Sequence, residues 1–377
     1  MGSTMRFVIF LSVVLGVWAL QHLYVGWRLA ALPVFAPGPG RKALLIALGI
    51  GFATYPLGRI LFSAGWYGLG RGLEYAGAVW MGTLFLLFFA LIPVDLVTLG
   101  GLVLKNLVVP LRTAAAVIAL VAAVVAWWGG LKEPRIVREE VEIAGLPAAA
   151  DGLTLAHLTD LHLGTILGDD HLRTVIELTD GLEPDVVVIT GDLVDGDAGV
   201  VEQLLPRLQT LRAPDGVFAV LGNHEYYAGR ERSRALLRDA GYIVLDNAAA
   251  AVRPGAWIAG VPDARGSAQT GAPEADLAAA LADVPAGEGI VLLQHSPEDE
   301  PQAAAAGVDL MLNGHTHGGQ IWPFHLLVKT TYPSLAGRYQ HGTMTQLVSR
   351  GAGTWGPPMR LFAPSEILLI TLRSPPS

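Results

Sequence analysis

Two histidines, His315 and His317, lie two positions apart in the stretch GHTHGG, directly after the apolar run VDLMLN. In an extended segment, residues two apart point the same way, so both imidazoles can face one cavity. Asp160 and His162 repeat this spacing after the apolar run LTLAHL. Imidazole nitrogens and carboxylate oxygens are ligands that suit Mn, Fe or Zn. The two patterns therefore predict a metal site.

Three further turns supply the same kinds of side chain. Asp192 lies in GDLVDGD, Asn223 and His224 lie in GNHE, and His295 lies in QHSP, each after a short apolar run. In α/β proteins the carboxyl ends of neighbouring strands border the ligand crevice, so we expect all five turns to share one site. Such a set exceeds the needs of one tetrahedral ion. One aspartate can bridge two ions about 3.5–4 Å apart, the separation used in phosphoryl displacement.

The elements that position these turns form an α/β domain over residues 152–377. Short apolar runs that end in polar, glycine-containing turns predict strands, and the spacing at 169–182 and 229–241 predicts helices. Residues 132–151 mix charged and aliphatic residues, which indicates a linker followed by a first, half-exposed strand.

Composition indicates that another part of the chain lies in lipid. Of the 377 residues, 52% are hydrophobic and 15% are charged, and the mean hydropathy is +0.47. Residues 1–131 carry eight basic and two acidic residues, a net charge of +6, so the rest carries −14 of the total of −8. An acidic domain repels a phosphate backbone, which disfavours nucleic acid as a partner. The chain has no cysteine, which excludes thiolate metal sites.

Residues 1–131 contain four long apolar runs, at 7–20, 43–64, 76–104 and 113–131. About 20 apolar residues span a bilayer, so we predict an integral, multi-pass protein of the plasma or inner membrane, with the first run retained as an anchor. Basic residues number six on one side of the membrane and five on the other, which decides little, and the cluster of Lys132, Arg135 and Arg138 after the last run favours a cytoplasmic catalytic domain. Arg59 and Asp95 fall inside the runs; we expect them near span ends or paired with each other, and the alternative is a polar path or lipid-head contact.

The five turns resemble the signature of the calcineurin-like metallophosphoesterases. The blocks DLH, GDLVDGD, GNHE, the histidine of QHSP and GHTH occur in that family's order over residues 152–320. The resemblance implies two packed mixed β-sheets flanked by helices. It makes Asp160, His162, Asp192 and His317 ligands of one metal and Asp192, Asn223, His295 and His315 ligands of a second. His224 would contact the phosphate and protonate the leaving oxygen.

The tail, GGQIWPF and LVSRGAGTWGPPMRLFAPSEILLITL, is similar to the membrane-associated bacterial branch of that family. This likeness implies a membrane-anchored hydrolase with two divalent ions, Mn favoured, that cleaves a phosphoester or pyrophosphate bond of a lipid-linked substrate. Alternatives are the same chemistry on a soluble nucleotide or small phosphoester, or a membrane protein that binds metal without turnover.

Three further residues are weaker candidates for substrate binding. Arg350 can hold a phosphate through two hydrogen bonds, although an ion pair is an equal alternative. Asp263 follows a strand in GVPDARG. Trp322 belongs to the apolar segment 321–339, which is too short and too interrupted by proline to span a bilayer; we expect it to lie in the membrane interface, with core packing as the alternative.

Overall fold

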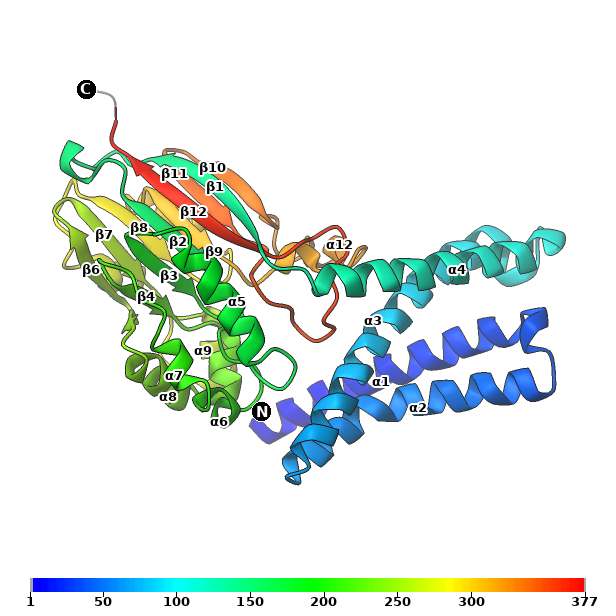
Figure 1. The fold of residues 1–377 in the computed structure, drawn as a ribbon. Helices are drawn as coiled ribbons and strands as arrows, with labels where there is room; N and C mark the ends of the chain where they lie inside the picture. Colours follow the sequence, from blue (N-terminus) through cyan, green and yellow to red (C-terminus); the bar gives the residue numbers. More distant parts are fainter. Residues whose placement is uncertain (1–2, 376–377) are drawn as a thin grey trace. The chain divides into compact units, whose positions relative to one another are not determined.

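The computed structural model of the protein describes residues 3–375 in two compact units (Figure 1). The first unit comprises Met1–Leu131 with Gly356–Leu361, and the second comprises Lys132–Trp355 with Phe362–Ser377. Within the described residues the first unit is helical, and the second contains two β-sheets with helices.

The first unit contains α1 (Ser3–Ala30), α2 (Pro39–Ser63), α3 (Tyr67–Thr98) and α4 (Lys105–Gly130). Among the described residues, three helical stretches are long and apolar enough to cross a membrane: Pro39–Ser63, Tyr67–Gly101 and Lys105–Gly130. They correspond to the last three predicted runs. Helix α1 covers the first run, but the side chains of residues 1–11 lie outside those that the structure describes. A fourth span therefore stays a prediction.

Helices α2 and α3 pack closely because glycines line their contact. A Cβ atom at Gly58 would lie 2.4 Å from the backbone nitrogen of Glu74, and one at Gly77 would lie 2.4 Å from that of Tyr55. Lipid tails are as apolar as leucine side chains, so membrane helices associate through such close packing of small residues. A side chain at either glycine would force the two helices apart.

Arg59 and Asp95 lie near the ends of α2 and α3, which is the first of the two expected arrangements, and each pairs with another residue instead of with the other. Arg59 contacts Glu74 at 3.0 Å, and Asp95 contacts Arg112 at 2.7 Å and Arg28 at 2.5 Å. The α2–α3 hairpin brings Arg59 beside the start of α3, whereas Asp95 lies near the end of α3. The side chains of Glu74 and Asp95 are 2% and 13% exposed, and charges so buried in such helices are expected to be paired.

The segment Gly356–Leu361 belongs to the first unit and packs on α4. The Arg360 amide donates a hydrogen bond to the Ala126 carbonyl at 2.7 Å. A Cβ atom at Gly130 would lie 2.3 Å from the Pro358 carbonyl oxygen, so the segment approaches α4 at a position that only glycine allows. Nothing in its short, proline-containing sequence indicates this packing partner.

The second unit contains two six-stranded mixed sheets, as expected (Figure 1). The first has the order β1-β12-β2-β3-β4-β5 and the second β10-β11-β9-β8-β7-β6. Strands β2, β3 and β4 are parallel neighbours in the first sheet, and β7, β8, β9 and β11 are parallel neighbours in the second. The strands are β1 (Arg135–Glu142), β2 (Thr154–Leu158), β3 (Val186–Thr190), β4 (Val217–Val220), β5 (Ile243–Val244), β6 (Ala248–Arg253), β7 (Ala256–Gly260), β8 (Gly289–Leu293), β9 (Leu310–Asn313), β10 (Gly337–His341), β11 (Met344–Val348) and β12 (Glu366–Arg373).

Helices cover the outer faces of both sheets. The buried core on the outer face of the first sheet includes residues of α5 and α8, and that of the second sheet includes residues of α10 and α11. The prediction at 169–182 is confirmed by α5, whereas α8 begins at Asn223, six residues before the predicted start, and bends at Gly229 (φ 110°). The helices are α5 (Asp169–Asp180), α6 (Ala198–Glu202), α7 (Leu205–Leu208), α8 (Asn223–Asp239), α9 (Ala264–Thr270), α10 (Leu277–Leu281), α11 (Glu300–Ala305) and α12 (His325–Val328).

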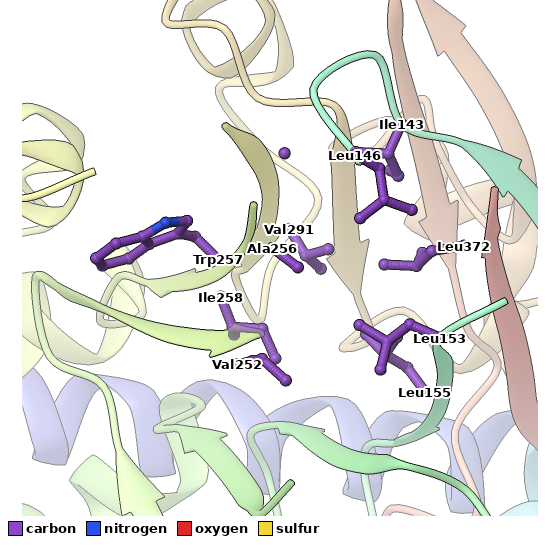
Figure 2. A pocket seen from close by; sticks show the side chains of 11 residues that line it. Ile143, Leu146, Leu153, Leu155, Val252, Ala256, Trp257, Ile258, Val291 and Leu372 are labelled. Carbon is purple, nitrogen blue, oxygen red and sulfur yellow. The ribbon is translucent and has the colours of Figure 1, made fainter. Parts of the chain in front are cut away.

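An apolar crevice lies between the two sheets. Figure 2 shows Ile143, Leu155, Ile258, Val291 and Leu372 around it, and its other lining residues are also apolar or glycine. The lining residues lie near the starts of β2, β7 and β8 and near the ends of β1, β6 and β12. The crevice belongs to the core that joins the sheets, and the candidate ligands lie at the opposite ends of these strands.

Candidate metal centre

The candidate ligands follow the carboxyl ends of five strands. Asp160 and His162 follow β2, Asp192 follows β3, Asn223 and His224 open α8 after β4, His295 follows β8, and His315 and His317 follow β9. Because β2, β3 and β4 are parallel neighbours, as are β8 and β9, their carboxyl ends meet at one edge of each sheet. This arrangement brings all eight side chains to the same end of the paired sheets.

The side chains form three groups whose ligand atoms lie within 4.8 Å of one another. The groups are Asp160 with His162 and His317; His162 with Asp192 and His224; and Asp192 with His295 and His315. The Nε2 atoms of His162 and His317 are 3.0 Å apart. His162 and Asp192 each belong to two groups, so the groups form one continuous cluster.

The chemistry of this cluster fits bound cations. His295 Nδ1 lies 2.7 Å from the Thr190 carbonyl, which can only accept a hydrogen bond. A neutral His295 therefore carries its proton on Nδ1 and turns the lone pair of Nε2 toward Asp192 Oδ2, at 3.1 Å. Asn223 Oδ1 is buried and has no hydrogen-bond partner among the described residues. A bound cation would accept the lone pair of His295 Nε2 and would provide a partner for Asn223 Oδ1.

Charge at the cluster supports the same reading. Burial lowers the pKa of His295, but the charge of Asp192 outweighs burial and raises that pKa well above its ordinary value. A cation bound beside Asp192 would take the place of this proton. The backbone is strained here as well, since five candidate ligands have left-handed φ angles of 46–69°: Asp160, His162, Asp192, His315 and His317.

The region that contains the candidate ligands is similar to proteins of a known family. The family described as calcineurin-like phosphoesterase matches residues 153–319. A metallophosphoesterase of Aquifex aeolicus is 34% identical over 241 residues, which cover 63% of this chain and 92% of that relative. The chain belongs to the calcineurin-like phosphoesterase family. The His and Asp groups at its strand ends offer ligands for a dinuclear metal site.

Two other relatives match over a smaller share of their length. A metallophosphoesterase of Campylobacter jejuni is 37% identical over 257 residues, or 64% of each chain. A transmembrane protein with metallophosphoesterase domain from Danio rerio is 34% identical over 271 residues, 69% of this chain and 62% of that protein. The chain therefore spans a little under two thirds of the length of these two relatives.

His224 of this calcineurin-like phosphoesterase lies at the edge of the cluster. Its Nδ1 is 2.8 Å from Asp195 Oδ1, and its Nε2 is 4.0 Å from Asp192 Oδ2. Burial lowers the pKa of His224, but the charge of Asp192 and the hydrogen bond with Asp195 outweigh it and raise that pKa to about 9. Sequence reasoning missed Asp195, although it is the second aspartate of the GDLVDGD block. Asp195 holds the ring with Nε2 directed into the site.

Replacement of Asp195 by asparagine tests this positioning. We expect a loss of turnover of roughly 10- to 100-fold, because a charge-assisted hydrogen bond contributes about 1.5–3 kcal/mol. Both metal ions should be retained, since Asp195 is not in the three groups. Turnover of an alkyl phosphate and metal content are the two measurements. Asp197→Asn, at an exposed side chain nearby on the N-cap of α6, is the matched control; equal turnover in the two variants would contradict the role of Asp195.

Glu225 is a second residue that sequence reasoning missed. Its buried carboxylate accepts hydrogen bonds from the backbone amides of Asp192 (2.9 Å), Val194 (2.8 Å) and Gly222 (2.7 Å). These bonds join the turn after β3 to the start of α8. Glu225 therefore fixes Asp192 relative to Asn223 and His224 without entering the cluster. Only the fold shows this, because the three amides come from two separate turns.

The three weaker candidates lie outside the cluster. Arg350 is held by Glu366, with its backbone amide at 2.9 Å and its Nη1 atom at 2.7 Å from that carboxylate. Asp263 caps α9, accepting from the Gly266 amide, and also accepts from the Ser296 hydroxyl. Trp322 is 50% exposed. Substrate binding by these residues stays a prediction.

Proposed function

We propose that the protein is a membrane-anchored phosphohydrolase that cleaves a phosphoester or pyrophosphate bond of a lipid-linked substrate. Asp160, His162, Asp192 and His317 would hold one divalent ion, and Asp192, Asn223, His295 and His315 a second. Ligands of nitrogen and oxygen, without thiolate, favour Mn over softer metals. Two such ions polarise the phosphoryl oxygens and lower the pKa of a bound water.

The side chains of this site divide the remaining work. Asp195 holds the His224 ring through Nδ1, which leaves Nε2 available to give a proton to the leaving oxygen. Asp195 keeps the ring oriented, and Glu225 keeps the turns that carry Asp192 and His224 in register. The site is thus arranged for bond cleavage, and a protein that only binds metal would not need the Asp195–His224 pair.

An exposed apolar surface beside the site carries the proposal of a lipid substrate. Trp322, Leu326, Leu327, Trp355 and Phe362, here called the apolar lip, are 50–83% exposed. The lip lies on two neighbouring segments, since Gln320 and Trp355 exchange two hydrogen bonds of 2.9 Å and Ile321 pairs with Phe362. The rings of Trp355 and His224 are 6.1 Å apart. Because His317 immediately precedes the first segment, an acyl chain on the lip would leave its headgroup near the metals.

The double variant Trp322→Ser with Leu327→Ser tests the lip. It removes two half-exposed apolar side chains, whose insertion into lipid contributes about 1–2 kcal/mol, so activity on phosphatidate vesicles should fall roughly 5- to 30-fold. Activity on propyl phosphate should change less than about twofold. Ile243→Ser, at a 44% exposed position on β5, is the control.

The same assay separates the lipid substrate from a soluble one. Equal losses on vesicles and propyl phosphate would show that the lip only supports the fold. Full activity of the double variant on vesicles would favour the alternative that the helices act only as a tether for an enzyme with soluble substrates. The assay is performed on the full chain with Mn²⁺, and protease protection in inverted vesicles tests the proposed cytoplasmic side.

A further inference from the structure

Arg265 packs on an aromatic ring that contacts the candidate ligand His315. The Tyr332 hydroxyl is 2.8 Å from His315 Nε2, and the two rings are 5.0 Å apart. The guanidinium carbon of Arg265 lies 4.6 Å from the centre of the Tyr332 ring. One aromatic ring, itself 4% exposed, therefore separates Arg265 from the cluster. Stacking on this ring restricts the directions in which the guanidinium can point.

The guanidinium of Arg265 is only weakly engaged. Its Nε atom lies 3.4 Å from Glu298 Oε1, at the long limit of a hydrogen bond. Its two terminal nitrogens have no hydrogen-bond acceptor among the residues that the structure describes. The side chain of Arg265 is 40% exposed, and that of Glu298 is 30% exposed. The side chain is therefore partly accessible to a ligand in solution.

Arg350, the arginine that the sequence indicated, is in a different position. The partner of Arg350, Glu366, is 2% exposed. Its carboxylate accepts hydrogen bonds from the backbone amide and from the side chain of Arg350. A ligand that displaced Arg350 would leave a buried carboxylate without that partner, which costs several kcal/mol. Glu298 is partly exposed, so water can solvate it when Arg265 turns to a ligand. The cost of recruiting Arg265 is correspondingly lower.

We propose that Arg265 binds a second anionic group of the substrate, a phosphate or carboxylate close to the scissile phosphoryl group. Planar guanidinium nitrogens bind such groups through two parallel hydrogen bonds. The inference rests on the proposed hydrolysis and adds a substrate class, namely phosphoesters with a neighbouring negative charge. Arg265 is then a specificity-determining residue, and its loss affects only substrates that carry this second charge.

Three water-soluble substrates test the inference without the apolar lip: propyl phosphate, propyl diphosphate and 3-phosphonooxypropanoate. In Arg265→Ala, kcat/KM should fall about 10- to 100-fold for a substrate whose second group the arginine binds, and less than about threefold for propyl phosphate. A loss confined to the diphosphate identifies phosphate as the second group, and a loss confined to the phosphonooxypropanoate identifies carboxylate. Arg173→Ala is the matched control, because Arg173 is similarly exposed and forms ion pairs only within helix α5 among the described residues.

A binding measurement and a second variant complete the test. Calorimetry should show that Arg265→Ala weakens binding of methylenediphosphonate about 10-fold or more but leaves binding of methylphosphonate unchanged. Glu298→Gln, which removes the competing carboxylate, should strengthen binding of methylenediphosphonate. Equal loss on all three substrates in Arg265→Ala would overturn the proposed role of Arg265 but not the proposed hydrolysis. Absence of hydrolysis of all three by the wild-type protein with Mn²⁺ would instead overturn the proposed function.

Discussion

Replacement of Asp192 by asparagine is expected to release both metal ions. Asp192 is the candidate ligand proposed to serve both metals, and it lies 3.1 Å from His295 and 3.9 Å from His162. Loss of its charge removes one negative ligand from each ion at once. Changes to groups that merely orient a ligand weaken metal affinity about 10- to 100-fold, so loss of a bridging ligand should exceed about 100-fold at both sites. Metal analysis of the purified protein measures the outcome.

The matched comparison for this variant is Asn223→Ala. Asn223 is assigned to the second ion alone, so about one ion should remain in that variant. Asp170→Asn makes the same charge change at a 95% exposed side chain on α5 and should leave both ions bound. Near-full occupancy of two ions in Asp192→Asn, with unchanged thermal stability, would refute the bridging role.

The grouping of the site was predictable because strand ends obey a topological rule. Asp160 and Asp192 follow buried apolar runs that form parallel neighbours in the first sheet, and parallel strands bring such ends to one edge. His295 follows a buried run of the second sheet, whose corresponding edge lies at the same end of the paired sheets. The residues that orient the site were not predictable in this way. Glu225 acts on backbone amides 31 and 33 positions away, and Tyr332 reaches His315 only because α12 and the following turn fold back. Such contacts depend on tertiary structure, which spacing along the chain does not encode.

In the helical unit, too, the elements could be predicted from sequence whereas their contacts could not. Length and apolarity suffice to locate α2, α3 and α4, because both properties can be read in one window of sequence. Partner choice depends on which helix faces are in contact, so the pairing of Arg59 with Glu74 was missed. Contacts of Gly356–Leu361 with α4 were missed for a related reason, since a backbone carbonyl against a glycine leaves no pattern of hydrophobic residues.

Replacement of His224 by alanine is expected to abolish most turnover while both ions stay bound. The imidazole is held by Asp195 at 2.8 Å and supplies a proton rather than a metal bond in the proposed reaction. Loss of a general acid lowers turnover by roughly 10²- to 10⁴-fold. The loss should be large for propyl phosphate, whose alkoxide leaving group needs protonation, and smaller for nitrophenyl phosphate, whose leaving group is acidic. Turnover of both esters and metal content are measured on the same preparation.

The Asp195–His224 pair provides an internal control for this prediction. If Asp195 acts only by orienting His224, the double variant Asp195→Asn with His224→Ala should be no slower than His224→Ala alone, because the two substitutions remove one shared function. Additive losses would give Asp195 a separate role. Equal losses on the propyl and nitrophenyl esters in His224→Ala would exclude proton donation to the leaving group, and loss of an ion in that variant would make His224 a ligand. Retained metal, a leaving-group-dependent loss and no further effect of Asp195→Asn together distinguish a proton donor from a structural histidine.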